Sequence, residues 1–333
     1  MYKRKRLSAE EYIKGILEGD RFKLGRAITL VESNLPDDLE IAEQVIAGII
    51  EHTGKSIRVG ITGVPGVGKS TFIETFGERL VSNGKKVAVL AVDPSSPDTQ
   101  GSIMADKTRM NVLSRNENAF IRPTPAGSSL GGVARKTRET MLLCEAAGFD
   151  YIIVETVGIG QSEVAVKQMT DFFLLLMLAG AGDELQGIKK GVMEMADMVA
   201  ITKADGNNIH PSKLAKAEYS AALHLYRIKK SKWKPAVVTC SALDGTNVDI
   251  IENEIEAFIR LVTNSGWLNH NRLKQNKHWM EESIREAMIQ RFYNAKSVKS
   301  KLSEITMLVE EGKISPYKAS RILIESYEKE KAT

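Results

Sequence analysis

The chain has 333 residues, of which 43% are hydrophobic and 26% are charged. This composition is typical of a globular protein with one large core or two linked ones, so intrinsic disorder is not expected. The 46 basic and 42 acidic residues are interspersed and leave a formal charge of only +4, so no single-sign field predicts a nucleic-acid partner.

The sequence also argues against secretion and membrane insertion. Its longest apolar run, residues 172–179, is far shorter than the ~20 residues of a membrane-spanning helix and predicts a buried strand instead. The basic start, residues 3–6, is followed by acidic residues rather than by an apolar signal region. Cys144 and Cys240 lie in apolar patterns that are typical of reduced thiols in a cytosolic core. We therefore expect a cytoplasmic protein with no membrane partner.

The first 54 residues are predicted to form a helical N-terminal extension. Ser8 and Glu11 have the spacing of a capping box, in which each side chain accepts a hydrogen bond from an amide at a helix start. After a break at residues 34–36, apolar residues recur at the spacing of one helix face, and this helix should end near Gly54. The apolar stripe comprises Ala42, Val45, Ile46, Ile49 and Ile50.

Residues 55–264 show a different pattern, in which short β-branched runs alternate with helical segments. This alternation is typical of βαβ units whose parallel strands are buried on both faces. It predicts an α/β fold with a doubly wound, mostly parallel sheet. The predicted strands are residues 59–62, 87–92, 151–154, 172–178, 198–202 and 236–240.

From Trp267 onward no strand pattern returns, and residues 265–333 are predicted to be helical. Apolar stripes at Met280, Ile284 and Met288 and again around Ile305 indicate helices. Pro316 should open a further helix, because its missing amide is tolerated at the first helical position. A helical tail of this length cannot bury all its stripes alone. We expect it to pack on the sheet domain or on a second copy, and we favour a C-terminal dimerisation segment and a homodimer.

A phosphate-loop motif lies between the first predicted strand and a helix predicted over residues 71–80. Gly63, four further residues and Gly68-Lys69-Ser70 match the pattern. The glycines let backbone amides face the β-phosphate, Lys69 bridges the β- and γ-phosphates, and the Ser70 hydroxyl binds Mg²⁺. This context predicts a nucleoside triphosphatase with a sheet of the P-loop NTPase type. The residues expected to hold the nucleotide here are Gly63, Val64, Pro65, Gly66, Val67, Gly68, Lys69, Ser70 and Thr71.

Acidic residues follow two of the other predicted strands. Asp93 ends the second strand and Glu155 ends the third, where carboxylates can bind the metal or position the attacking water. We expect both to act in catalysis beside Lys69 and to serve as metal ligands; capping a helix is the alternative role. Glu155 and Gly158 also have the spacing of an element whose glycine amide senses the γ-phosphate in switch GTPases.

Two segments favour guanine as the base. Thr202-Lys203-Ala204-Asp205 follows the fifth predicted strand, and a carboxylate at Asp205 can accept hydrogen bonds from guanine N1 and N2 while the stem of Lys203 covers the base. Ser241-Ala242-Leu243 is similar to a loop whose backbone amide contacts guanine O6. The usual first residue of the Lys203 element is Asn, so Thr202 leaves the strength of guanine selection open. We expect GTP and GDP as ligands, with Mg²⁺.

Four segments together resemble one family, the methylmalonyl-CoA-mutase-associated GTPases of the MeaB/ArgK type. They are residues 63–71, 92–97, 155–163 and 179–189, and the resemblance covers nearly the whole chain. It implies a GTPase that acts as chaperone of a cobalamin-dependent acyl-CoA mutase, with methylmalonyl-CoA mutase as the expected partner. In this family such a protein gates adenosylcobalamin loading and guards the mutase from inactivation.

The resemblance further implies which segments respond to the nucleotide. Residues 93–106 and 158–163 would be switches that the γ-phosphate and Mg²⁺ order, and residues 180–190 would relay the nucleotide state to the mutase. Asp106 would join the metal site.

Three alternatives stay open. A nickel-inserting GTPase for hydrogenase or urease maturation would want a His-rich or Cys-rich tract, and the five histidines form no such cluster. An accessory ATPase or kinase of arginine/ornithine uptake would prefer ATP, whereas Asp205 and Ser241 favour guanine. A module that binds nucleotide without hydrolysing it is the third.

Overall fold

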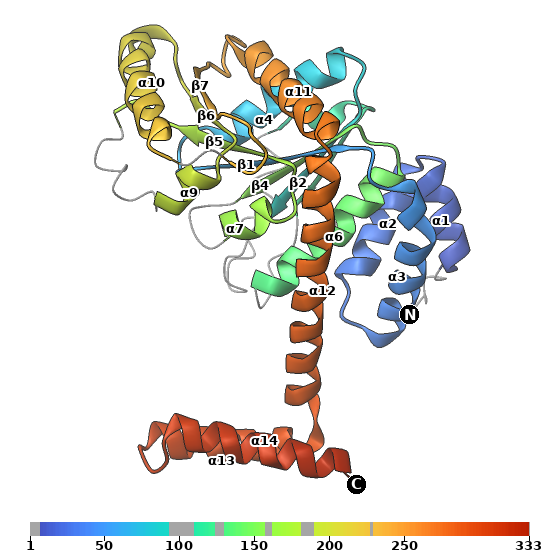
Figure 1. Cartoon of the computed structure of the whole chain (residues 1–333). Coiled ribbons are helices and arrows are strands. Elements are labelled where there is room, and N and C mark those ends of the chain that lie inside the picture. The colour runs from blue at the N-terminus through green and yellow to red at the C-terminus, as the bar shows by residue number, and fades with distance from the viewer. Residues whose placement is uncertain are drawn as a thin grey trace. The chain divides into compact units, whose positions relative to one another are not determined.

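The computed structural model describes residues 7–92, 110–123, 130–156, 162–180, 190–226 and 229–332 (Figure 1). The chain divides into two compact units, Met1–Gln275 and Asn276–Thr333.

The first unit begins with three helices, in the region that the sequence predicts to be helical. They are α1 (Ala9–Leu17), α2 (Arg21–Glu32) and α3 (Pro36–Ile49), followed by a short 3-10 turn, η1 (Ile50–His52). The predicted capping box is present: the Glu11 amide donates to the Ser8 hydroxyl over 3.2 Å, and the Ser8 amide donates to the Glu11 carboxylate over 2.7 Å. Asp20 caps α2, a helix that the apolar pattern does not single out.

A parallel sheet forms the centre of the first unit, which confirms the predicted doubly wound α/β fold. Its strands are β1 (Ile57–Gly63), β2 (Val87–Val92), β3 (Ala119–Pro123), β4 (Tyr151–Thr156), β5 (Phe172–Met177), β6 (Met198–Ile201) and β7 (Ala236–Thr239). Within the described residues the order is β3-β2-β4-β1-β5-β6-β7, and every pairing is parallel. The carboxyl ends of all these strands therefore meet at one edge.

Helices cover both faces of this sheet. Figure 1 shows α4 (Lys69–Ser82) and α11 (Val248–Asn264) on one face, with α6 (Leu130–Ala146) and α7 (Ser162–Lys167) on the other. The remaining helices of this part are α9 (Lys190–Met195) and α10 (Ile209–His224), with 3-10 turns η2 (Leu113–Arg115) and η3 (Gly206–Asn208). Strands β2, β4, β5 and β6 are buried throughout, as expected when both faces are covered. Cys144 and Cys240 are free and buried, which confirms their predicted place in the core.

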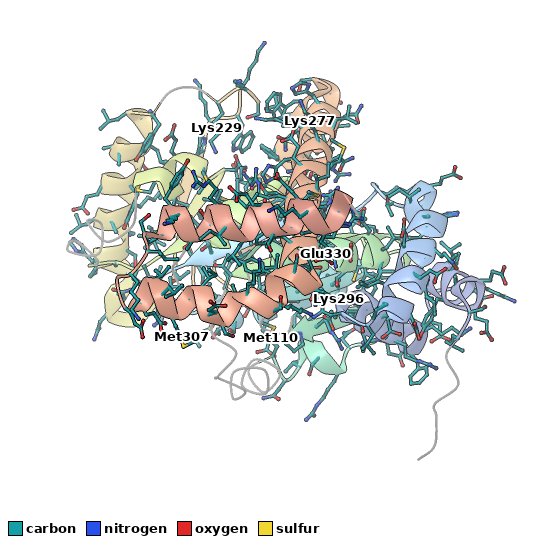
Figure 2. All side chains as sticks on the ribbon, turned by 90° about the horizontal axis from the view of Figure 1, so that it is seen from below. Met110, Lys229, Lys277, Lys296, Met307 and Glu330 are labelled. Carbon is teal, nitrogen blue, oxygen red and sulfur yellow. The ribbon has the colours of Figure 1, made fainter. Side chains whose placement is uncertain are left out.

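The second unit is helical, as predicted. Helix α12 (Trp267–Asn294) starts in the first unit and continues into the second, where α13 (Lys296–Glu310) and α14 (Pro316–Ala332) form a hairpin around a small core of Val298, Ile305, Ala319 and Leu323. Glu330 accepts hydrogen bonds from the amides of Lys296 and Ser297, so the end of α14 caps the start of α13 (Figure 2). Among the described residues, none of the helices combines the length and the apolar character needed to cross a bilayer.

Candidate nucleotide-binding site

The loop between β1 and α4 has the backbone that a phosphate cradle requires. Gly66 and Gly68 have φ angles of 78° and 93°, in the left-handed region that glycine enters without strain. Between them, the Val67 amide closes a turn on the Val64 carbonyl over 3.2 Å. At Gly63 a Cβ atom would lie 2.5 Å from the Leu176 carbonyl oxygen, so a side chain there would displace the loop from β5. The motif glycines are thus required by conformation and by space.

Lys69 extends over this loop from the first position of α4. Its Nζ donates to the Gly63 carbonyl over 2.8 Å and to the Val64 carbonyl over 3.4 Å. The ammonium group therefore lies against the cradle, where phosphate oxygens can replace or share these carbonyl contacts. Ser70 and Thr71 follow in the first turn of α4, at the positive end of the helix dipole.

The predicted base-reading loop after β6 lies directly against the phosphate loop. Thr202 donates its hydroxyl proton to the Val67 carbonyl over 2.7 Å. A Cβ atom on Gly68 would lie 3.8 Å from Cε of Lys203, so the lysine stem passes beside the phosphate loop. Lys203 itself has φ 54°, a left-handed conformation that turns the chain sharply after the strand.

Asp205 and Ser241, predicted to recognise the base from two separate segments, are in contact. The Ser241 hydroxyl donates to Oδ2 of Asp205 over 2.7 Å. The loop from Ser241 to Leu243 is held in turn by the Thr75 hydroxyl on α4, which donates to the Ala242 carbonyl over 2.7 Å. Ser241 is buried, whereas Leu243 is exposed at the surface of this loop. The structure therefore gathers phosphate loop, Lys203, Asp205 and the Ser241 loop at one edge of the sheet.

Glu155 lies at the same edge, near the end of β4. It pairs with Ile61 in β1 and Ala91 in β2, so it stands between the strand that leads into the phosphate loop and the strand that precedes Asp93. The residue is only 4% exposed, and beside it the hydroxyls of Thr156 and Thr62 share a hydrogen bond of 2.8 Å. A buried carboxylate at this position can serve as a metal or water ligand. Its role stays a prediction.

Other expected site residues lie outside the described part of the chain. They are Asp93, Asp106 and Gly158, together with most of the residues in the three segments expected to respond to the nucleotide. In contrast, the links made by Thr75 and by the Thr202 hydroxyl were not predicted. Thr202 drew notice in the sequence only because it departs from the usual Asn, and nothing in the spacing around Thr75 points to Ala242.

A doubly wound parallel sheet, with a glycine cradle after β1 and a Lys-x-Asp loop after β6, defines a P-loop nucleotide-binding protein. Comparison with known families gives the particular group. A family model described as methylmalonyl Co-A mutase-associated GTPase MeaB matches residues 24–297. The chain belongs to this family of GTPases, which confirms the resemblance seen in the four motif segments.

Individual relatives agree with this assignment. The chain is 48% identical to a probable GTPase of Mycobacterium tuberculosis, covering 92% of this chain and 91% of the relative. It is 45% identical to GTPase ArgK of Escherichia coli, covering 95% of each. It is 42% identical to a mouse protein named methylmalonic aciduria type A homolog, mitochondrial, covering 94% of this chain and 78% of that protein. Among solved structures, one titled LAO/AO transport system kinase matches with 40% identity and a TM-score of 0.74, covering 95% of this chain and 96% of the other.

Proposed function

We propose that this chain is a cytoplasmic, Mg²⁺-dependent GTPase that serves as chaperone of a cobalamin-dependent acyl-CoA mutase, with methylmalonyl-CoA mutase as its partner. GTP binding and hydrolysis would govern adenosylcobalamin loading and protect the mutase. The observation that carries the proposal is the cradle: Lys69 lies across a glycine loop that is hydrogen-bonded to the loop carrying Asp205. The family description, which names a mutase-associated GTPase, supports the partner.

The site residues then take the following roles. The amides of residues 63–68 hold the phosphates, Lys69 contacts the β- and γ-oxygens, and Asp205 with the Ser241 loop selects guanine. Hydroxyl and carboxylate oxygens are the ligands that Mg²⁺ prefers, which suits Ser70 and Glu155, with Asp93 and Asp106 as further ligands. Bound Mg²⁺ would neutralise charge on the phosphate oxygens. Domain boundaries at residues 54/55 and 264/265 remain part of the proposal.

Calorimetric titration with GDP, a non-hydrolysable GTP analogue and ADP in the presence of Mg²⁺ tests nucleotide binding. Replacing Lys69 by Ala should weaken GDP binding about 10- to 100-fold, because charge-assisted bonds to the phosphates are lost. Lys213 is an exposed lysine on α10, and Lys213→Ala is the matched control that should bind like wild type. Absence of heat with every guanine nucleotide would overturn the proposal.

A phosphate-release assay separates the enzyme from its alternatives. GTP hydrolysis that exceeds ATP hydrolysis supports the GTPase, whereas preference for ATP would favour the kinase of amino-acid uptake. Binding without phosphate release would identify a binding module.

For the chaperone role, a purified acyl-CoA mutase is passed over the immobilised protein loaded with GDP or with the GTP analogue. Equal retention in both states would contradict nucleotide-dependent coupling.

The second unit supports self-association of the chain as a homodimer. Helices α12 and α14 line an apolar groove of about 430 Å³ in this unit, and Met288, Ile289, Tyr293 and Ile324 along it are each about half exposed. A unit of this size rarely stabilises itself on its own core, and a second copy would cover the groove. Met288→Glu combined with Ile324→Glu should give a monomer in sedimentation analysis, while the exposed Lys318→Glu on α14 should not. Wild-type protein that sediments as a monomer would refute the dimer.

A further inference from the structure

Thr202 occupies the first position of the base-reading element and is 2% exposed. Its hydroxyl lies 2.7 Å from the Val67 carbonyl oxygen and 3.2 Å from the Met177 carbonyl oxygen. The Met177 carbonyl already accepts the Thr202 amide over 2.8 Å. One side chain therefore joins the end of β5, the start of the base-reading loop and the phosphate loop.

The number of hydrogen atoms available decides what else this side chain can do. A threonine hydroxyl has a single proton, and both atoms within its reach are carbonyl oxygens that only accept. The shorter contact assigns that proton to Val67, so no proton remains for a base. Asparagine, the usual residue here, has two N–H donors and can hold the loop and donate to a base at once. Guanine has an acceptor at N7, on the edge away from the N1 and N2 groups that Asp205 would bind.

We propose that Thr202 is a positioning residue that fixes the phosphate loop to the base-reading loop and leaves guanine N7 without a side-chain donor from this element. The inference rests on the proposed binding of guanine nucleotides at this site. Base selection then depends on the Watson–Crick edge of guanine, which Asp205 would bind with a carboxylate whose Oδ2 accepts the Ser241 hydroxyl proton.

Affinities for three diphosphates, GDP, 7-deaza-GDP and IDP, distinguish the contribution of the N7 edge from that of the Watson–Crick edge. In 7-deaza-GDP the N7 acceptor is replaced by a C–H group, and IDP lacks the 2-amino group. Wild-type protein should bind GDP and 7-deaza-GDP within about twofold of each other and IDP about tenfold more weakly, the effect of one lost hydrogen bond to a charged group. A loss of about fivefold or more with 7-deaza-GDP would overturn the inference and leave the GTPase proposal intact. Failure of all three to bind would overturn both.

Variants at Thr202 test the positioning role. Thr202→Ser keeps the proton and should behave as wild type with each nucleotide. Thr202→Val keeps the shape but leaves the Val67 carbonyl without its donor, so GDP and 7-deaza-GDP should weaken together by about five- to tenfold. Thr202→Asn supplies an extra donor and should create a preference for GDP over 7-deaza-GDP. Melting temperatures without nucleotide check that the variants fold. Wild-type affinity in the valine variant, or a selective loss of GDP there, would refute the proposal.

Discussion

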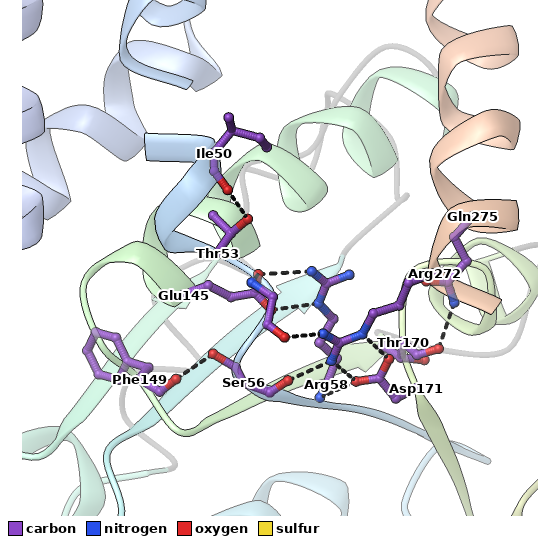
Figure 3. Close-up of polar contacts among 11 residues, drawn as sticks. Ile50, Thr53, Ser56, Arg58, Glu145, Phe149, Thr170, Asp171, Arg272 and Gln275 are labelled. Atoms are coloured by element: carbon purple, nitrogen blue, oxygen red, sulfur yellow. Dashed lines mark hydrogen bonds and ion pairs between the residues drawn. The ribbon is translucent and has the colours of Figure 1, made fainter. Parts of the chain in front are cut away.

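The two edges of the same parallel sheet are held together in different ways. Among the described residues at the carboxyl edge, single hydrogen bonds join the segments of the candidate site, such as Thr202 to Val67 and Thr75 to Ala242. At the amino edge, buried ion pairs join the neighbouring strands and helices (Figure 3). Arg58 on β1 donates from Nε and Nη2 to Glu145 on α6 over 2.7 and 2.9 Å.

A second ion pair at the amino edge extends this network to α12. Arg272 donates from Nε and Nη2 to Asp171 over 2.9 and 2.6 Å, and it also donates to the carbonyls of Gly54 and Ser56 (Figure 3). Asp171 additionally accepts the Arg58 amide. Arg272 and Asp171 each have several hydrogen-bond partners, and Arg58 forms a two-bond pair with Glu145, so we expect that edge to be the more rigid anchor. In the described part of the carboxyl edge, the links between the loops named here are single hydrogen bonds, which suits a site whose remaining contacts come from a ligand.

The largest effect on stability is expected from Glu145→Ala at the amino edge. The side chain of Arg58 is 5% exposed, and removing the Glu145 carboxylate would leave the buried charge of Arg58 without its counter-ion. Burial, and then the charge of Arg58, lowers the pKa of Arg138 to about 10, so the variant would also remove one of the acids that counter the repulsion between these two arginines. We expect the free energy of unfolding to fall by about 3–5 kcal/mol in urea titrations.

Glu282→Ala is the matched control for this prediction. Glu282 pairs with Arg285 on α12 at the surface, and the loss of such a pair should change the free energy of unfolding by less than about 1 kcal/mol. If Glu145→Ala were as mild as this control, the amino edge would not be the anchor that its geometry indicates.

At the carboxyl edge, Asp205→Asn should change ligand choice rather than stability. The Ser241 hydroxyl can still donate to the new amide oxygen, so the fold should be retained. GDP should bind about 10- to 100-fold more weakly, because an amide cannot accept from N1 and N2 as a carboxylate does. Xanthosine diphosphate has a carbonyl in place of the 2-amino group, so it should bind the Asp205→Asn variant more tightly than it binds wild type. Calorimetry measures both, and the exposed Glu218→Gln on α10 should leave GDP binding unchanged. Equal loss of both nucleotides would contradict base reading by Asp205.

The strands show what the sequence could predict of the fold. Strands buried on both faces appear as nearly continuous apolar runs, and their predicted positions fall within two residues of the observed ones. Strand β3 was not predicted because this edge strand lacks an apolar run: only Ala119 is buried in it, and it ends with Arg122 and Pro123.

The candidate site likewise contains some features that the sequence predicts and others that only the folded structure shows. Its contiguous motif, residues 63–70, was predictable because the backbone and the side chains expected to contact the nucleotide lie within one loop and the start of one helix. The tie between Thr202 and Val67 spans 135 positions and depends on how two loops pack, which spacing cannot reveal. Arg58 and Glu145 were equally hidden, because charged residues are mostly exposed and only the folded structure shows that this pair is buried.

A milder stability effect is expected at the amino end of β6, where Asp197 pairs with Lys167 and Lys229 over 2.5 and 2.7 Å. Burial opposes its ionisation, but the two lysines outweigh burial and lower the pKa of Asp197 below its ordinary value. Its stabilising contribution is therefore complete above the unfolded pKa of about 4 and is lost as the pH falls through the folded pKa.

Asp197→Asn tests this contribution. The variant should cost about 1–2 kcal/mol of unfolding free energy at neutral pH, since the lysines lose their counter-charge while the amide oxygen can still accept from Phe173. The difference from wild type should shrink in acid. The exposed Glu218→Gln on α10 serves as control. A difference that does not change with pH would show that the ion pairs do not stabilise this edge.

The two cysteines probe both edges with the smallest disturbance. Cys144 adjoins Glu145 at the anchor, and Cys240 adjoins Ser241 in the candidate site; both are buried. Burial raises the pKa of Cys240 to about 12, and burial together with the charge of Glu145 raises the pKa of Cys144 further. Because the thiolate is the reactive form, labelling by N-ethylmaleimide near neutral pH requires opening of the structure. We expect Cys240 to label faster, through local opening of its loop, and Cys144 only on global unfolding. GDP should then slow Cys240 more than Cys144 in time-resolved mass spectrometry, whereas an unchanged ratio of the two rates would mean that both edges open in one step.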